Sequence, residues 1–229
     1  MGSATLSDLK RTAIITAGGI GKRMKSDVPK QFLLLGDTPI LMHTIQRFFD
    51  FDTSIEILVT LPKEWWSYWN ELCEKHNFKI PVQLIEGGKE RYHSVQKAVQ
   101  LAKGEIIAVH DGVRPLVNNQ TIQKAFQLAE EKGSGIPVVS LKESIRKQTK
   151  DGNEAVNRKD YVLVHTPQCF RSEWLKEAYK ISYLDTFTDD ASVVEKLGRP
   201  INFSESNEEN IKITTPNDLK IAALFLDQP

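Results

Sequence analysis

The amino-acid sequence predicts an α/β fold with a mostly parallel sheet flanked by helices. Short apolar runs rich in β-branched residues alternate with amphipathic segments of helical length. This alternation is typical of parallel strands joined by crossover helices. Glycine pairs at 18–19 and 87–88 follow two of the runs, at the strand ends where open sheets bind ligands. After residue 141 the alternation stops in a long polar stretch, so we expect a segment there to leave the sheet.

The first expected strand is 12–17, Thr-Ala-Ile-Ile-Thr-Ala, which ends at a glycine pair. The segment 39–51 then carries apolar residues at helical spacing. The same two patterns repeat along the chain. They predict further strands at 55–60, 82–85, 105–110 and 136–141, and further helices at 63–76, 90–103 and 121–132. The helix at 63–76 carries Trp65, Trp66 and Trp69, which we expect to form an apolar patch on an outer helix.

The C-terminal part is expected to contain a helix from Ser172, a second opened by 188–192, a strand at 210–214 and a last helix. Thr215 can cap that last helix, Pro216 suits its first position, and Asp218 lies three residues after the cap. There is no internal repeat. We therefore expect residues 1–229 to form a single domain, which is long enough to bury a substantial core.

The polar stretch 142–160 is dense in Lys and Arg and contains Asp151-Gly152. Asp-Gly between two extended segments is a signal for a hairpin turn. We expect a protruding β-hairpin arm over about 142–164, and a solvated surface hairpin is the alternative.

The composition excludes several classes of protein. Thirty basic and thirty acidic residues balance, which indicates no attraction to nucleic acid or to a membrane surface. Cys73 and Cys169 are far apart and form no Cys-x-x-Cys pair, so we expect free thiols in a reducing cytoplasm. No apolar run could span a bilayer, and the polar start of the chain lacks the centre of a signal peptide.

The loop after the first strand reads Ala-Gly-Gly-Ile-Gly-Lys-Arg-Met over 17–24, followed by Pro-Lys-Gln at 29–31. Glycines at such a position let backbone N–H groups approach an anion closely. The loop is not a Walker motif, because a threonine stands five residues before its last glycine. It is not the dinucleotide fingerprint, because Met24 takes the third glycine position. Three cations, Lys22, Arg23 and Lys30, surround the loop, which suits a triphosphate.

These residues resemble the sugar-nucleotide pyrophosphorylase family, and within it the 2-C-methyl-D-erythritol 4-phosphate cytidylyltransferases. The resemblance extends from residue 13 to residue 226. Further matching stretches are 87–91 with Ser94, 110–115, 165–170, 188–192 and 210–214. The resemblance implies a Rossmann-like sheet of the nucleotide-diphospho-sugar transferase type, with the arm serving a homodimer.

The resemblance also implies a reaction. A phosphate oxygen of the acceptor attacks the α-phosphorus of CTP in line with the departing pyrophosphate, without a covalent enzyme intermediate. Catalysis then rests on positioning and charge stabilisation. Arg23 and Lys30 match the family's stabilisers of the transition state, and Arg158 and Lys212 match the pair that orients the attacking phosphate. Mg²⁺ is expected to bridge the CTP phosphates, with its protein ligands unassigned.

Binding residues follow from the same resemblance. The nucleotide is expected against Ala17, Gly18, Gly19, Gly21, Lys22, Gly88, Ser94 and Asp111. The acceptor is expected against Asp111, Arg114, Ser144, Thr166 and Thr188. For each of the two threonines, a cap or turn role is the alternative. Arg158 is expected to reach the site of a partner subunit through the arm.

The chain departs from the family pattern at three positions. Lys89 stands where the cytosine-reading loop normally carries an acid, Gly112 where an alanine is usual, and Ser144 where a threonine is usual. The departure at Lys89 leaves the details of base recognition open.

The sequence also bears on three other functions. Ribitol 5-phosphate is the alternative acceptor, because several stretches fit both enzymes, whereas the arm and 188–192 favour methylerythritol phosphate. A non-catalytic nucleotide-binding module is less favoured, because every catalytic cation is present. A glycosyltransferase would need an Asp-x-Asp motif after a strand, and none follows residues 110–111.

Overall fold

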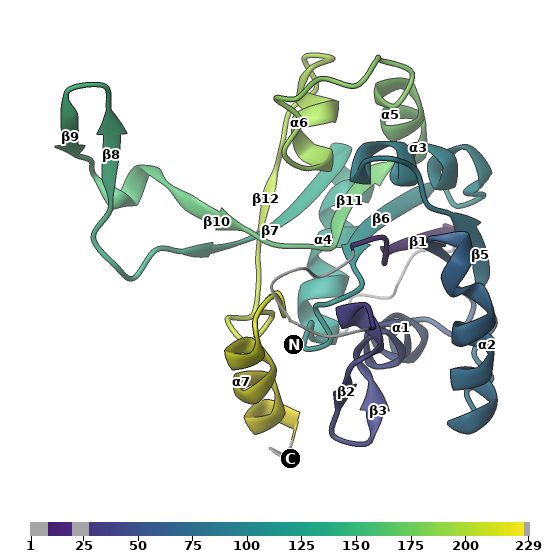
Figure 1. The fold of residues 1–229 in the computed structure, drawn as a ribbon. Helices are drawn as coiled ribbons and strands as arrows, with labels where there is room; N and C mark the ends of the chain where they lie inside the picture. Colours follow the sequence, from purple (N-terminus) through teal and green to yellow (C-terminus); the bar gives the residue numbers. More distant parts are fainter. Residues whose placement is uncertain (1–8, 20–27, 227–229) are drawn as a thin grey trace, which may run out of the picture.

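The computed structural model describes residues 9–19 and 28–226, and within them eight strands form one main sheet. These strands are β1 (Arg11–Thr16), β4 (Glu56–Leu61), β5 (Gln83–Glu86), β6 (Ile106–Asp111), β7 (Ser134–Ser140), β10 (Val162–Val164), β11 (Gln168–Arg171) and β12 (Phe203–Glu205). Their order is β10-β7-β11-β6-β1-β4-β5, with β12 paired to β7 (Figure 1). The predicted fold class is confirmed.

The first four strands of the sheet to appear in the chain, β1, β4, β5 and β6, are all parallel. β4 lies on one side of β1 and β6 lies on the other, so the strand order reverses at β1. Ligands of open α/β sheets bind in the crevice at such a reversal, beyond the carboxyl ends of the strands. The register pairs Thr16 with Asp111, so the loop after β1 and the loop after β6 emerge side by side.

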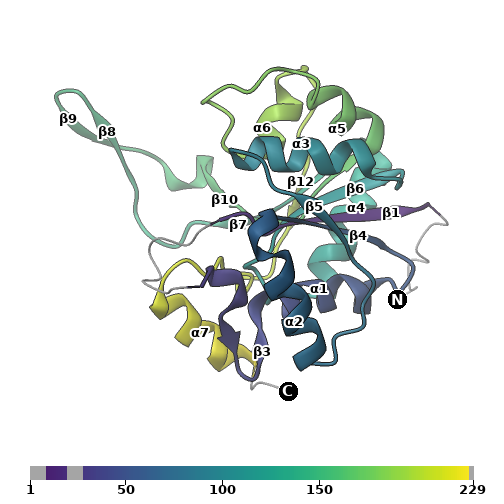
Figure 2. The same ribbon diagram turned by 45° about the vertical axis from the view of Figure 1, so that its right-hand side comes forward.

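Helices cover both faces of the sheet (Figure 2). One layer contains α1 (Ile40–Phe51), α2 (Trp66–Lys75) and α4 (Asn119–Lys132). The other contains α3 (Arg91–Leu101), α5 (Ser172–Ala178) and α6 (Asp190–Glu195). Ala13 and Ile15 of β1 belong to the first layer and Ile14 to the second, which is the alternation of a strand buried on both faces.

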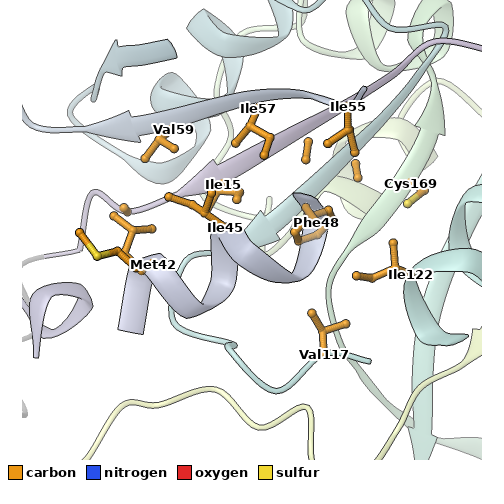
Figure 3. Packing of buried hydrophobic residues seen from close by; sticks show 14 of the residues in the cluster. Ile15, Met42, Ile45, Phe48, Ile55, Ile57, Val59, Val117, Ile122 and Cys169 are labelled. Atoms are coloured by element: carbon orange, nitrogen blue, oxygen red, sulfur yellow. The ribbon is translucent and has the colours of Figure 1, made fainter. Parts of the chain in front are cut away.

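The first layer anchors β1 and β4. Met42, Ile45 and Phe48 of α1 share one helical face and lie against the strand residues around Ile15 and Ile57, as Figure 3 shows. Burying each such side chain stabilises the fold by about 1.5–3 kcal/mol. The end of β1, from which the glycine loop starts, is therefore rigidly placed.

The tryptophan-rich segment forms a short 3-10 turn, η3 (Lys63–Trp65), followed by α2. The expected outer patch is corrected in part, because Trp69 is fully buried in the first layer and Trp66 donates its indole N–H to the Leu61 carbonyl at 3.0 Å. Trp65 is half-buried and packs on Phe32, with ring centroids 5.8 Å apart. The cluster thus supports the segment around residue 30.

The predicted strand at 210–214 is wrong. This segment pairs with no strand. Its backbone makes isolated hydrogen bonds instead, such as the one from the Ile213 N–H to the Val113 carbonyl at 2.9 Å. β12 takes the pairing with β7 instead. The helix α7 (Pro216–Leu226) follows as predicted, and Thr215 and Asp218 cap its start reciprocally.

The predicted hairpin is present. β8 (Arg146–Thr149) and β9 (Gly152–Ala155) pair in antiparallel register, and Gly152 adopts a positive φ of 141° at their turn. Figure 1 shows the hairpin standing away from the sheet, and every residue of both strands is exposed. No helix in the described ranges is long and apolar enough to cross a membrane.

A buried polar chain holds the carboxyl end of β6. The Thr166 hydroxyl accepts from the Asp111 backbone N–H at 3.1 Å and lies 3.0 Å from His110 Nδ1. His110 Nε2 lies 3.1 Å from the Arg114 carbonyl, which can only accept. Nε2 therefore carries the hydrogen, and Nδ1 accepts from Thr166. Burial keeps this imidazole neutral by lowering the pKa of His110 to about 4.

The neutral His110 predicts a loss of stability in mild acid. Its pKa rises from about 4 in the folded chain to an ordinary 6.5 on unfolding, so the unfolded chain binds more protons between these values. The stability that the neutral His110 contributes is fully present above pH 6.5 and is lost as the pH falls. At pH 5 the free energy of unfolding is lower by about 2 kcal/mol on this account. Urea unfolding at pH 7.5 and pH 5 should show a smaller pH effect in His110→Gln than in the wild type. Equal pH effects in the two proteins would contradict the assignment.

Candidate active site

A cavity of about 350 Å³ lies at the carboxyl ends of β1, β4 and β6. Its lining includes eight residues predicted for the site: Ala17, Gly18, Gly19, Lys30, Gly88, Ser94, Asp111 and Lys212. A larger hollow of about 760 Å³ lies at the other end of β1, around Arg11 and Asp52, and contains none of the predicted residues. The smaller cavity is therefore the candidate site. Gly21, Lys22 and Arg23 lie outside the described residues.

Lys30 is placed by the 3-10 turn η2 (Lys30–Phe32). Phe32 anchors this turn in the first layer, where its ring lies edge-on to Tyr68 with centroids 5.3 Å apart. The buried Gln31 donates its side-chain N–H to the Ala17 carbonyl at 2.5 Å, which ties the turn to the glycine loop. Sequence reasoning gave Gln31 no role, although it belongs to the Pro-Lys-Gln stretch that it singled out.

The second glycine loop turns tightly into α3. The Ser94 hydroxyl accepts from the Gly88 backbone N–H at 2.9 Å and lies 3.2 Å from the Glu90 carbonyl, to which it can donate. A Cβ atom on Gly88 would lie 2.4 Å from the Cβ of His93, so only glycine fits here. Lys89 and Glu90 at the tip of the turn are exposed and line the cavity.

Asp111 is the centre of a charge cluster. Its Oδ2 lies 3.2 Å from Arg114 Nε and 3.1 Å from Lys212 Nζ, and its Oδ1 lies 3.9 Å from Arg91 Nε. Burial by itself would raise the pKa of Asp111, but the attraction of Arg91, Lys212 and Arg114 outweighs it and holds the pKa below its usual value. The carboxylate is therefore ionised throughout the physiological pH range.

Sequence reasoning missed the role of Arg91 and Asp190. Arg91 binds Asp190 through both terminal nitrogens, at 3.0 and 2.6 Å, and the Tyr179 hydroxyl donates to the same carboxylate at 2.6 Å. Asp190 is fully buried. Both residues lie in stretches that carried the family resemblance, so a search for charged residues within those stretches would have found them.

The remaining predicted residues lie outside this cavity. Arg114 and Thr166 are buried behind Asp111 and are used in its support: Arg114 also donates to the Asn210 carbonyl at 2.6 Å. Thr188 lines an adjoining hollow of about 160 Å³, which shares Glu90 and Arg91 with the cavity. Arg158 and Ser144 are exposed on the arm, and Ser144 lies between β7 and β8 rather than in a strand. Within one chain, these two are not brought to the cavity.

The residues of the cavity suit a metal ion that binds mainly through the phosphates of a substrate. In the described part of the chain, no three His, Cys, Asp or Glu side chains form a group that could hold a metal ion. Asp111 and Glu90 are the carboxylates found there among the lining residues. Mg²⁺ usually binds through one or two carboxylates together with substrate phosphates and waters, so the residues present fit that arrangement.

Known proteins resemble the whole chain. A protein from Phocaeicola vulgatus named 2-C-methyl-D-erythritol 4-phosphate cytidylyltransferase is 48% identical, over 95% of this chain and 100% of that protein. One with the same name from Porphyromonas gingivalis is 50% identical, over 95% of this chain and 98% of that protein. The crystal structure of 4-diphosphocytidyl-2C-methyl-D-erythritol synthase from Anaerococcus prevotii has the same fold, with a TM-score of 0.83 and 23% identity over 96% of this chain and 97% of that one.

The family model described as IspD: 2-C-methyl-D-erythritol 4-phosphate cytidylyltransferase matches residues 12–228. This range includes both glycine loops, Asp111 and its cations, and the arm. Every residue that lines the cavity falls within this range. The chain therefore belongs to the 2-C-methyl-D-erythritol 4-phosphate cytidylyltransferase family.

Proposed function

We propose that the chain transfers a cytidylyl group from CTP to 2-C-methyl-D-erythritol 4-phosphate. The products are 4-diphosphocytidyl-2-C-methyl-D-erythritol and pyrophosphate, and the reaction serves non-mevalonate isoprenoid precursor synthesis. The carrying observation is that the cavity gathers the glycine loop, Lys30, Asp111 and Lys212 around one volume of about 350 Å³. That volume lies within the usual range of small-molecule sites.

The nucleotide is placed by the two glycine loops. The turn at Gly88 and Ser94 meets the base, and the backbone at Ala17, Gly18 and Gly19 meets the phosphates, since backbone N–H groups there can donate to anions. Lys30, held by Gln31 and Phe32, faces the charge that grows on the α-phosphate during the transfer. Arg23 is proposed to share that task, and Gly21 and Lys22 to complete the phosphate loop.

The acceptor phosphate is the nucleophile, so the enzyme has no covalent step to perform. Lys212 is proposed to orient the attacking phosphate, and its Nζ lies 3.1 Å from Asp111 Oδ2. Asp111 can accept a hydroxyl of a bound substrate through its second oxygen. Thr188, in the adjoining hollow, is proposed to meet the acceptor. Arg114 and Thr166 act by keeping Asp111 in place.

Mg²⁺ is proposed to enter with CTP and to neutralise charge on its phosphates. Asp111 and Glu90, the carboxylates among the described lining residues, would contribute to its coordination. The cytoplasm is proposed as the compartment, which the free thiols of Cys73 and Cys169 support.

The arm is proposed to form a homodimer in which each chain completes its partner's site. Arg158 and Ser144 are exposed and lie outside the cavity of their own chain. The strand β10, at the end of the arm, exposes Val162, Leu163 and Val164, an apolar edge that a second copy could cover. A two-fold axis would bring Arg158 of each chain to the acceptor phosphate of the other.

The roles of Lys30 and Arg23 predict a loss of turnover. Lys30→Ala and Arg23→Ala should each lower kcat by roughly 10²-fold, with a smaller effect on CTP binding, because both cations act on charge that develops in the transition state. Lys63→Ala is the matched control: Lys63 also begins a 3-10 turn after a proline, but it lies outside the cavity. Unchanged kcat with a raised KM for CTP would refute the assigned roles.

The substrates are tested by pyrophosphate release. With CTP, methylerythritol 4-phosphate should give a higher kcat/KM than D-ribitol 5-phosphate. ATP and GTP should be poor donors, because the turn at Gly88 is proposed to accept cytosine, whose ring is smaller than a purine. A preference for ribitol phosphate would replace the acceptor, and equal use of purine nucleotides would refute the cytidylyl assignment. Lys89→Glu, which restores the family's usual charge, measures how far Lys89 affects that choice.

Subunit complementation tests the arm. Arg158→Ala and Asp111→Ala should each be nearly inactive, and Lys159→Ala, a neighbouring exposed cation on η4 (Arg158–Asp160), should stay active. If Arg158 acts on the partner's site, a heterodimer of the two inactive chains has one site with both lesions and one site with neither. A fully exchanged mixture should then recover about a quarter of wild-type activity. Heterodimers confirmed by mass that stay inactive would show that the arm does not complete the partner's site.

A further inference from the structure

Arg91 occupies the wall between the candidate site and the adjoining hollow. Arg91 lines both the 350 Å³ cavity and the 160 Å³ hollow that Thr188 also lines. Arg91 is the first residue of α3, directly after the turn at Gly88, whereas its partner Asp190 is the first residue of α6. The two residues lie 99 positions apart in the chain. One ion pair therefore connects the nucleotide-side turn with the segment proposed for the acceptor.

The carboxylate of Asp190 is held by contacts with Arg91 and Tyr179. Its carboxylate is completely buried, accepts both terminal nitrogens of Arg91 and accepts the hydroxyl of Tyr179. Burial by itself would lower the pKa of Arg91, but the charge of Asp190 and its hydrogen bonds raise it instead. Asp190 thus compensates Arg91 and fixes the plane of the guanidinium, since a bidentate contact allows one orientation.

The fixed guanidinium turns its remaining edge toward Asp111. Arg91 Nε lies 3.9 Å from Asp111 Oδ1, while Arg114 and Lys212 contact Oδ2. Of the three cations, Arg91 has the largest lowering effect on the pKa of Asp111. The oxygen left to accept a substrate hydroxyl is therefore the one that faces Arg91.

We propose that Arg91 is a positioning residue, held by Asp190 and Tyr179, that orients Asp111 and joins the nucleotide side of the site to the acceptor side. The proposal rests on the proposed function. It predicts that loss of the clamp impairs use of the acceptor more than binding of CTP. The glycine loops keep their own supports, Gln31 to Ala17 and Ser94 to Gly88, which do not involve Arg91.

The test compares three variants with a matched control. Arg91→Met removes the clamp, Arg91→Lys keeps the charge but not the bidentate geometry, and Tyr179→Phe removes one hydrogen bond to Asp190. Arg199→Met is the control, because Arg199 also pairs with an acid, Glu177, but on the exposed surface of the same layer. Titration calorimetry with CTP gives the affinity and the fraction of folded sites, and pyrophosphate release gives kcat per site and the KM of the acceptor.

Arg91→Met should lower kcat/KM for the acceptor by about tenfold or more, with CTP affinity changed by less than about threefold. Arg91→Lys should also lower kcat/KM for the acceptor more than the affinity for CTP, but by a smaller factor. Tyr179→Phe should have a still smaller effect of the same kind, and Arg199→Met should match the wild type. A merely structural pair would reduce the fraction of folded sites and leave kcat and KM per site unchanged. That result, or full activity of Arg91→Lys, would overturn the proposal.

If Arg91→Met does not fold, Arg91→Lys and Tyr179→Phe decide the question by the same measurements. A wild-type protein that binds CTP but releases no pyrophosphate with any polyol phosphate would overturn the proposed function instead. An active wild type with unaffected variants would overturn the role of Arg91 alone.

Discussion

The ionised carboxylate of Asp111 lies under three cations at the carboxyl end of β6, and the arrangement of the site depends on it. A buried carboxylate is costly unless opposite charges and hydrogen bonds compensate it. Each compensating group comes from a different part of the chain: Arg91 begins α3, Arg114 follows β6, and Lys212 lies on the segment before α7. Compensating the charge of Asp111 therefore brings the start of α3 and the segment before α7 to the end of β6.

The backbone at this point is held as firmly as the charge. The Thr166 hydroxyl accepts from the Asp111 N–H and donates to His110 Nδ1, and Arg114 spans from the carboxylate to the Asn210 carbonyl. These groups are buried and would be expensive to leave without partners. The glycine loop across the strand reversal is held by the hydrogen bond from Gln31 to Ala17, and the turn that carries Gln31 packs through Phe32 on the aromatic cluster of η3 and α2. The polar network around Asp111 and the packed turn at 30–32 thus support two sides of one cavity.

The local placement of the charges explains how a chain of zero net charge can hold a strongly anionic substrate. The cations are concentrated where the phosphates are expected, and the buried acids Asp111 and Asp190 balance part of their charge. Lys212 is proposed to move from Asp111 to a substrate phosphate, because Arg91 and Arg114 would still compensate the carboxylate. The remaining cation proposed for the acceptor, Arg158, lies on the exposed arm, which is why a second chain is proposed to supply it.

Sequence alone determined the alternating strands and helices, the hairpin at Asp151-Gly152, the cap of α7 and the family, because each is encoded by local pattern or by ordered motifs. It also identified Lys30, Asp111 and Lys212, which lie in those motifs. The tertiary structure decided that 210–214 forms no strand, that Trp69 is buried, and that Thr166 and Arg114 support Asp111 from behind. It alone revealed the pairing of Arg91 with Asp190, because a contact between residues 99 positions apart leaves no periodic trace in the sequence and forms only when two helices pack on the same face of the sheet.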